Sequence, residues 1–302
     1  MERLATDPLL RSEQADSFAT NGFLTFEQLV SPCELRELKK TIGELFEKRA
    51  GEKEGAHLDL VAPGKPGTIQ TSPQITNPVN YAPRLHQAQF FQNALAIAKQ
   101  LLGEKTRCLW DFAILKTPEN GAPTPWHQDE ASRDPNFEYT ELTIWIALQD
   151  TSIENGCLRF IPGSNRAGVF AHGFANDDSS SHALQCVHDF DVDAAVSCPL
   201  RAGDCTIHHP RTLHCSSPNI SARPRFGYIL VFGLAPRPID THRSFPWLQE
   251  RHTIAQERRR RWMRRGGLFV TMWRKMRRRE VPDWASVKYA VKRSLEVLHS
   301  GR

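Results

Sequence analysis

Apolar residues in the first third of the chain recur at helical spacing. An amphipathic helix is predicted from Ser31-Pro32 to about residue 50, because one face carries Leu35, Leu38, Ile42, Leu45 and Phe46. Ser31 suits the N-cap of this helix and Pro32 its first turn. Further helices are predicted over residues 13–19 and 86–102, with a short strand over 23–26. The N-terminal third is therefore expected to form a mainly helical layer.

After residue 105 the pattern changes to short apolar runs that are separated by Gly and Pro turns. Strands are predicted over residues 106–116, 126–131, 140–150, 157–161, 186–193, 196–200, 204–208 and 225–234. Residues 140–150 are apolar at most positions, which predicts a deeply buried strand. Because no helices alternate with these strands, the pattern favours an all-β sandwich or barrel behind the helical layer.

Two segments show neither the helical nor the strand pattern of apolar residues. Residues 51–85 are rich in Gly, Pro, Thr and Asn, and residues 165–185 in Gly, Ser, Asp and His. Long loops within a compact domain are commonly functional, so we expect residues 51–85 to lie near an active site.

The end of the chain differs from the rest in charge. Residues 251–302 carry 16 Lys or Arg against 4 Asp or Glu, a net charge of +12, whereas the preceding 250 residues carry −7. Helices are predicted over 250–265, 270–279 and 284–299, with Gly266-Gly267 between the first two. We therefore divide the chain into a domain over residues 1–240 and a basic helical extension over 241–302.

Three interpretations of the basic extension stay open. Its arginines alternate with Trp and Met, a composition typical of helices that lie on an anionic membrane surface. Binding to a nucleic-acid backbone is a weaker alternative. The third interpretation is a docked helix whose arginines face solvent or pair with the acidic domain. A membrane contact would favour a lipid or lipid-linked substrate.

Composition indicates the class of protein and its cellular compartment. Of 302 residues, 40% are hydrophobic and 24% charged, which is ordinary for a globular protein. Seven cysteines without a Cys-x-x-Cys pair predict reduced thiols and a cytoplasmic location, with the membrane surface as a variant. The first residues do not match a signal peptide, and no run approaches the roughly 18 apolar residues of a membrane span.

The candidate chemistry begins at Trp126-His127-Gln128-Asp129. In an extended segment, His127 and Asp129 point to the same face. One imidazole and one carboxylate are two thirds of a 2-His-1-carboxylate iron site. The pair alone is weak evidence, since a half-buried strand with two polar residues on its solvent side has the same pattern.

A second motif lies about 85 residues downstream, in the run His214-Cys215-Ser216-Ser217-Pro218-Asn219-Ile220-Ser221 and then Arg225. With His127 and Asp129 it resembles the phytanoyl-CoA dioxygenase family of iron(II)- and 2-oxoglutarate-dependent oxygenases. The turn Glu154-Asn155-Gly156 and the following residues to Ser164 are similar to a family signature, although Asn165 stands where the family usually has His. The resemblance spans roughly residues 14–235 and implies a double-stranded β-helix, or jelly-roll, core.

The resemblance implies a ligand set for Fe(II) made of His127, Asp129 and His214. Three open metal positions would take 2-oxoglutarate as a chelate and O2. The distal carboxylate of 2-oxoglutarate needs a fixed cation, and the planar fork of Arg225 suits it, with Ser216 as a hydroxyl partner. Arg223 is the rival for this carboxylate. His208 and His209 are the rivals of His214 as ligand.

Three further positions match the family with less force. Trp145 matches an aromatic residue of the co-substrate pocket, with a plain core Trp as the equal alternative. Lys116 matches a Lys near the co-substrate in some members, but a solvated Lys at a strand end fits equally. Phe112 shares a strand face with Lys116 and is either a pocket wall or, more simply, a core residue.

Asp129 also bears on the reaction. Related halogenases have a small residue at this position, so the carboxylate favours hydroxylation of an aliphatic C–H bond, with 2-oxoglutarate converted to succinate and CO2. A small-molecule or lipid-like substrate is expected. The alternative is a binding protein on the same scaffold that has lost its iron chemistry and is tethered by its basic end to a membrane or nucleic acid.

Overall fold

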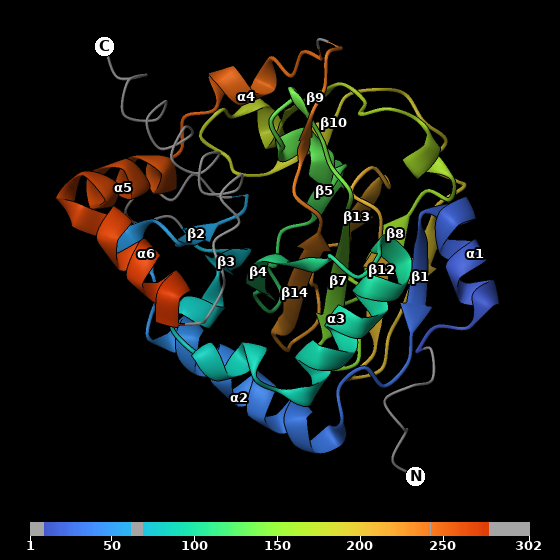
Figure 1. Ribbon diagram of the computed structural model, residues 1–302, viewed down its shortest axis with the longest axis horizontal. Coiled ribbons are helices and arrows are strands. Elements are labelled where there is room, and N and C mark those ends of the chain that lie inside the picture. Colours follow the sequence, from blue (N-terminus) through green and yellow to red (C-terminus); the bar gives the residue numbers. More distant parts are fainter. Residues whose placement is uncertain (1–8, 62–68, 242, 278–302) are drawn as a thin grey trace.

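Two facing antiparallel sheets form the centre of the molecule. The computed structural model describes residues 9–61, 69–241 and 243–277. One sheet has seven strands in the order β1-β12-β7-β14-β4-β3-β2, and the other has four in the order β11-β8-β13-β5. Trp145 and Ala147 of the large sheet pack against Leu158 and Phe160 of the small one. The predicted mainly β, jelly-roll fold is confirmed (Figure 1).

The strands of these sheets are short, apart from two. The large sheet contains β1 (Phe23–Phe26), β2 (His57–Asp59), β3 (Pro73–Thr76), β4 (Arg107–Lys116), β7 (Glu141–Ala147), β12 (Cys205–His208) and β14 (Arg225–Gly233). The small sheet contains β5 (Thr124–His127), β8 (Leu158–Phe160), β11 (Val196–Cys198) and β13 (His214–Ser216). Two ribbons complete the set: β9 (His172–Phe174) with β10 (Leu184–Cys186), and β6 (Phe137–Glu138) with β15 (Arg237–Pro238).

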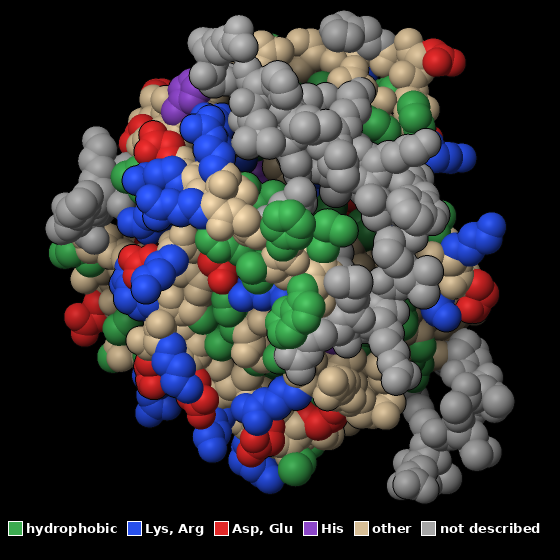
Figure 2. Space-filling view, turned by 60° about the vertical axis from the view of Figure 1, so that its left-hand side comes forward, with side chains coloured by type: hydrophobic (Ala, Val, Ile, Leu, Met, Phe, Trp, Pro, Cys, Tyr) green, Lys and Arg blue, Asp and Glu red, His purple; other side chains and the backbone are tan. Residues whose placement is uncertain are grey.

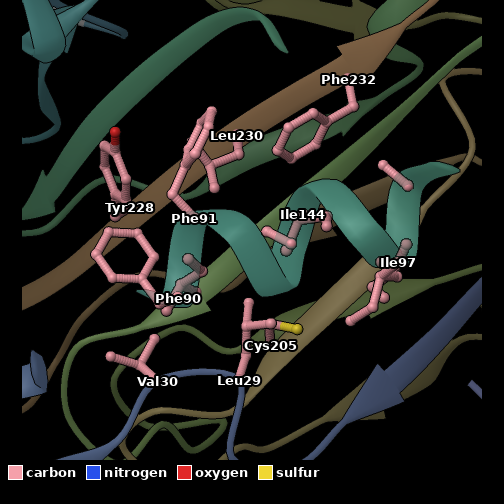
Figure 3. Close-up of a cluster of buried hydrophobic side chains, with 14 of the residues drawn as sticks. Leu29, Val30, Phe90, Phe91, Ile97, Ile144, Cys205, Tyr228, Leu230 and Phe232 are labelled. Carbon is pink, nitrogen blue, oxygen red and sulfur yellow. The ribbon is translucent and has the colours of Figure 1, made fainter. Parts of the chain in front are cut away.

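Helices cover the outer face of the large sheet. They are α1 (Ser12–Asn21), α2 (Pro32–Glu47) and α3 (Gln89–Leu102). The Ser31 hydroxyl accepts a hydrogen bond from the Glu34 amide, as expected of the N-cap of α2. Figure 3 shows Phe90, Phe91 and Ile97 of α3 against Tyr228, Leu230 and Phe232 of β14. This core holds one face of the large sheet rigid, and the opposite face is left for the site.

Three local predictions were wrong. Residues 51–85 are not wholly irregular, because β2 and β3 extend the edge of the large sheet, with Thr76 paired to Phe112. Of the strand predicted over 186–193 only Cys186 is in a strand, as the last residue of β10, and β9 and the rest of β10 lie in the segment predicted as a loop. Asp129 is not in a strand, since β5 ends at His127 and Asp129 opens the short 3-10 helix η4 (Asp129–Ser132).

The last two helices of the C-terminal segment pack beside the edge of the large sheet that ends in β2, whereas the first packs near β9. It contains α4 (Trp247–Glu250), α5 (Ile254–Trp262) and α6 (Leu268–Arg277), with a π-helical turn at Met263–Gly267. Both guanidinium Nη atoms of Arg274 donate to the Glu54 carboxylate, and Arg274 lies over the ring of Tyr81. The helix predicted over 284–299 lies outside the described residues.

The division at residue 240 stays a prediction, although residues just beyond it contact the core. The Trp247 indole donates to the Ala131 carbonyl of η4. No helix among residues 9–61, 69–241 and 243–277 is long and apolar enough to cross a membrane.

Candidate metal centre and active site

Three side chains converge between the two sheets at the end of β5. His127 is the last residue of β5 and His214 the first of β13, and the two are paired in the sheet. Asp129 comes from η4, two residues after the strand end. One ligand atom each from His127, Asp129 and His214 lies within 4.8 Å of the others, so these residues form a group that could hold a metal ion.

The two imidazoles are oriented with the same nitrogen inward. Nδ1 of His127 donates to the Pro125 carbonyl at 2.8 Å, and Nδ1 of His214 donates to the Thr212 carbonyl at 2.9 Å. A carbonyl can only accept, so Nδ1 carries the proton and Nε2 keeps its lone pair. The two Nε2 atoms lie 3.7 and 3.9 Å from Oδ1 of Asp129. Backbone acceptors thus fix the tautomers that metal-binding histidines need.

Charges in the group suit a divalent cation. Burial lowers the pKa of His127, and burial together with His127 and His208 lowers that of His214. Burial alone would raise the pKa of Asp129, but the three neighbouring histidines outweigh it and hold this pKa well below its usual range. At neutral pH the set is therefore two neutral imidazoles and one carboxylate.

Residues around Asp129 anchor the turn that carries it. The side-chain Nε2 of Gln128 donates to two backbone carbonyls, at Gly168 and Arg211. Glu130 is fully buried and binds Arg211 at 2.8 Å and Arg243 at 2.7 Å. No sequence pattern pointed to this triad, because Arg211 and Arg243 lie 81 and 113 residues away from Glu130. These anchors fix the backbone on both sides of Asp129.

Two more groups approach the Asp129 carboxylate. The Thr143 hydroxyl donates to Oδ2 at 2.8 Å, and Nε2 of His208 lies 3.5 Å from the same oxygen. The sequence held a signal for Thr143, which precedes Trp145 by two and so shares its face of the buried strand. His208 entered the sequence analysis only as a rival ligand. The structure places it beside Asp129 and outside the three-residue group.

A buried cationic pocket lies along the same face of the large sheet. Arg225, which is 1% exposed, pairs in register with Lys116, and its guanidinium lies 5.0 Å from the centre of the Trp145 ring. Nε and Nη1 of Arg225 have no hydrogen-bond partner. No carboxylate of the described residues forms an ion pair with Arg225 or Lys116. Two buried basic side chains without a carboxylate partner in the protein make this pocket suited to an anion from outside the chain.

Burial shifts the pKa of both cations downward. For Lys116 burial comes first and the Arg225 charge second, and together they lower the pKa to about 6. Burial lowers the pKa of Arg225 to about 10. The Lys116 ammonium donates to the Ala122 carbonyl. Gly227 makes room for the Trp145 ring, since a Cβ atom there would lie 2.5 Å from it.

The remaining predicted residues lie on neighbouring strands. Ser216 is buried on β13, two residues after His214 and on the same face. Phe112 is half-buried on β4 and shares a face with Lys116. Arg223 is exposed before β14 begins, which separates it from the buried pocket of Arg225. Nδ1 of His209 accepts from the Arg211 amide.

The donors fit the groups that the sequence resemblance implies. Two imidazoles and a carboxylate on one side of a site, two of them more than one-fifth exposed, leave the other side open. Nε and Nη1 of Arg225 have no partner in the protein, so this guanidinium has free donors for a carboxylate. Iron(II) and a dicarboxylate such as 2-oxoglutarate match these donor sets.

Comparison with known proteins agrees with this geometry. The family model "Phytanoyl-CoA dioxygenase (PhyH)" matches residues 18–227. A phytanoyl-CoA dioxygenase of Arabidopsis thaliana is 26% identical over 73% of this chain and 88% of its own length. A probable alpha-ketoglutarate-dependent hypophosphite dioxygenase of Stutzerimonas stutzeri is 28% identical over 74% of this chain and 78% of its own.

A solved structure gives the same result. The crystal structure of EvdO2 from Micromonospora carbonacea var. aurantiaca, complexed with 2-oxoglutarate, superposes with a TM-score of 0.69. It is 32% identical and covers 82% of this chain and 99% of its own. Because the family model covers more than half of the chain, the chain belongs to the phytanoyl-CoA dioxygenase (PhyH) family of Fe(II)- and 2-oxoglutarate-dependent dioxygenases.

Proposed function

We propose that this dioxygenase hydroxylates an aliphatic C–H bond of a small-molecule or lipid-like substrate and releases succinate and CO2. His127, Asp129 and His214 would hold Fe(II), which activates O2 together with 2-oxoglutarate. Arg225, flanked by Trp145, Lys116 and Ser216, would bind the distal carboxylate of the co-substrate. The observation that carries the proposal is the three-donor group within 4.8 Å beside a buried, unpaired guanidinium.

The carboxylate at position 129 supports hydroxylation over halogenation. Halide binding at such a metal needs space where a carboxylate would stand, and Asp129 occupies that space here with Oδ1 toward the two histidines. The names of the relatives do not select one substrate, because they include both phytanoyl-CoA and hypophosphite enzymes. Phe112, half-buried on the site face of β4, is proposed as a pocket wall.

A metabolite-library screen that measures succinate formation tests the enzyme and finds its substrate. The protein is supplied with Fe(II), 2-oxoglutarate and O2, and products are analysed by mass spectrometry for the gain of one oxygen atom. We expect substrate-dependent succinate from the wild type and none from Asp129→Ala. A wild-type protein that binds neither Mn(II) nor 2-oxoglutarate would overturn the enzyme assignment and favour the binding-protein alternative.

We also propose that the C-terminal helices place the enzyme on an anionic membrane surface facing the cytoplasm. Arg274 turns toward Glu54, and the opposite side of α6 exposes Phe269 (76%) and Met272 (51%). Val270, one turn before Arg274, is also exposed (40%). Arg261, Arg264 and Arg265 are exposed nearby. Figure 2, with this side turned forward, shows basic and apolar side chains next to each other. Outward apolar residues beside cations suit a lipid headgroup layer better than a nucleic acid.

Two further proposals concern the compartment and the domain organisation. Seven free cysteines, most of them buried, support a reducing compartment such as the cytoplasm. The charge contrast supports residues 1–240 as the catalytic domain and 241–302 as its basic extension.

Vesicle co-sedimentation of the full chain tests the membrane contact. Vesicles of phosphatidylcholine alone are compared with vesicles that contain phosphatidylserine. We expect pelleting with the anionic vesicles, and loss of it in Phe269→Glu/Met272→Glu. Ile153→Glu is the matched control, because Ile153 is 63% exposed on a distant turn. Equal pelleting of the wild type and the double variant would remove the proposal, and binding to an oligonucleotide instead would favour the nucleic-acid interpretation.

A further inference from the structure

His208 is a buried polar residue without a hydrogen-bond partner. It ends β12 and is 2% exposed, and neither Nδ1 nor Nε2 makes a hydrogen bond within the described residues. Leaving a buried polar group unpaired destabilises the folded state. A side chain of this kind in a folded protein calls for an explanation by function or by a missing partner.

The ring of His208 is held against the metal-site residues. Its centre lies 4.4 Å from that of His214 and 5.3 Å from that of Phe160. Pairing of β12 with β1 on one side and β7 on the other fixes the backbone, with His208 opposite Phe23 and Thr143. The position of this imidazole is therefore set by the sheet and not by the loop that carries Asp129.

The two oxygens of Asp129 have different surroundings. Oδ1 lies 3.7 and 3.9 Å from Nε2 of His127 and His214. Oδ2 points away from this pair and accepts the Thr143 hydroxyl at 2.8 Å, while Nε2 of His208 lies 3.5 Å from it. A carboxylate with one oxygen occupied by protein donors offers the other oxygen to a metal.

We propose that His208 is a positioning residue of the metal centre. Together with Thr143 it holds Oδ2 of Asp129, so that Oδ1, which faces His127 and His214, would be the oxygen offered to the metal. The proposal rests on the proposed function. His208 acts through Asp129 and is not a fourth ligand, since the group with mutual distances within 4.8 Å contains only His127, Asp129 and His214 among the described residues.

The proposal needs no charge on His208. The neutral tautomer with the proton on Nε2 can donate toward Oδ2, which leaves Nδ1 as the atom without a partner. A side-chain amide can replace this donor, whereas an aromatic ring of similar size cannot. This difference separates positioning from simple packing.

Metal binding by two substitutions at position 208 tests the proposal. His208→Phe keeps the ring and its contact with Phe160 but loses the donor, whereas His208→Gln keeps a donor. Mn(II) affinity is measured by electron paramagnetic resonance, and coordination by the visible spectrum of the Co(II) protein. We expect His208→Phe to weaken Mn(II) binding about 10–100-fold, the range for loss of a group that orients a metal ligand, and to alter the Co(II) spectrum. His208→Gln should recover most of the affinity.

A second variant, Thr143→Val, tests the same role without changing position 208. The result therefore does not depend on whether His208→Phe folds correctly. If both donors act on Oδ2, the double variant Thr143→Val/His208→Phe should lose less affinity than the two single losses combined. Wild-type Mn(II) affinity and an unchanged Co(II) spectrum in His208→Phe would overturn the role of His208 and leave the proposed function standing. Absence of metal binding by the wild type would overturn both.

Discussion

At the scale of single residues, the arrangement of Arg225 and Lys116 points most directly to anion binding. Two cationic side chains lie side by side in a buried part of the sheet, and each loses favourable hydration there. Their pKa values fall for this reason, that of Lys116 to about 6. A bound dicarboxylate would supply the missing negative charge, and its binding should therefore be coupled to the protonation of Lys116.

The affinity for 2-oxoglutarate should decrease as the pH rises. With a pKa of about 6, Lys116 is mostly neutral at neutral pH when no anion is bound, and a bound carboxylate favours its protonated form. Binding then takes up a proton, and the dissociation constant should rise by up to about tenfold per pH unit above pH ~6. Titration calorimetry with saturating Mn(II) over a pH series measures this slope.

Lys116→Met should bind 2-oxoglutarate more weakly and lose the pH slope. Lys99→Met is the control, because Lys99 is a partly exposed residue of α3 that pairs with Glu104. A wild-type dissociation constant that does not change with pH would contradict the coupling.

Gly227 should not tolerate a methyl group. A Cβ atom at this position would lie 2.5 Å from the Trp145 ring, which stands over Arg225. Gly227→Ala must displace this ring, and overpacking of a buried site costs about 1–3 kcal/mol. We expect a lower free energy of unfolding in urea and weaker binding of 2-oxoglutarate. Gly43→Ala, in α2 with open space around it, should instead stabilise the protein slightly.

Sequence alone predicts the candidate site residues better than their surroundings. His127, Asp129, His214 and Arg225 are implied by the family resemblance that two motifs carry, and the structure brings the first three together. The sequence does not reveal that Arg225 is buried and Arg223 exposed. The two arginines are only two positions apart at the start of a strand, so alternation along the strand does not distinguish them. The approach of His208 to Asp129 depends on pairing between β12 and β7, which is a tertiary contact.

At the scale of elements, the turn η4 carries the only carboxylate of the three-residue group. The strand prediction for residues 126–131 failed here because His127 ends β5, while Glu130 leaves the strand direction to reach Arg211 and Arg243. Buried ion pairs between distant parts of a chain leave no local sequence signal. Likewise β2 and β3 are only 3 and 4 residues long and carry several polar residues, so their own sequences do not predict strands. They form because β3 pairs with the neighbouring strand β4.

Loss of Arg243 should damage both stability and metal binding. The Arg243 guanidinium pairs with the Glu130 side chain, which is 0% exposed. The same guanidinium also donates to the carbonyls of Pro135 and Phe137. Breaking a buried ion pair costs about 3–5 kcal/mol, because the remaining charge loses its partner. We expect Arg243→Met to approach this loss in urea unfolding, although Arg211 still compensates part of the Glu130 charge.

Arg237→Met is the matched control from the same stretch of chain. Arg237 pairs with Glu138 at the surface, where the two side chains are 72% and 46% exposed. Such a pair contributes less than about 1 kcal/mol. Mn(II) affinity should fall in Arg243→Met and stay unchanged in Arg237→Met. Equal metal affinity in both variants would show that the turn is held without Arg243.

At the scale of the whole molecule, the basic extension is docked through α5 and α6 at the edge of the large sheet next to β2. Gly55 allows the close approach, since a Cβ atom there would lie 2.4 Å from the Ala255 carbonyl oxygen. Arg258 adds a contact to Glu52 at 3.7 Å. The charge contrast that was visible in the sequence thus becomes an electrostatic attachment between the basic helices and acidic residues just before β2.

The Glu54–Arg274 pair should control how firmly α6 is attached. Its side chains are 17% and 20% exposed, and both carboxylate oxygens accept hydrogen bonds from the guanidinium. Bidentate, charge-assisted bonds of this kind are stronger than ordinary surface pairs. Burial raises the pKa of Glu54, but Arg274 and Tyr81 outweigh it and the pKa is lowered, so the carboxylate stays ionised at neutral pH.

Glu54→Gln should release the helices without unfolding the domain. Trypsin cleaves after exposed arginines such as Arg264 and Arg265, and a loosened α5–α6 segment should be cut there faster than in the wild type. Glu44→Gln removes an exposed pair with Lys48 and serves as control, with an unchanged cleavage rate expected. Because Arg274 faces inward in the docked state, release would also free its charge for lipid headgroups. Stronger pelleting of Glu54→Gln with anionic vesicles would therefore accompany faster cleavage, and equal cleavage rates in all three proteins would show that apolar packing holds α6.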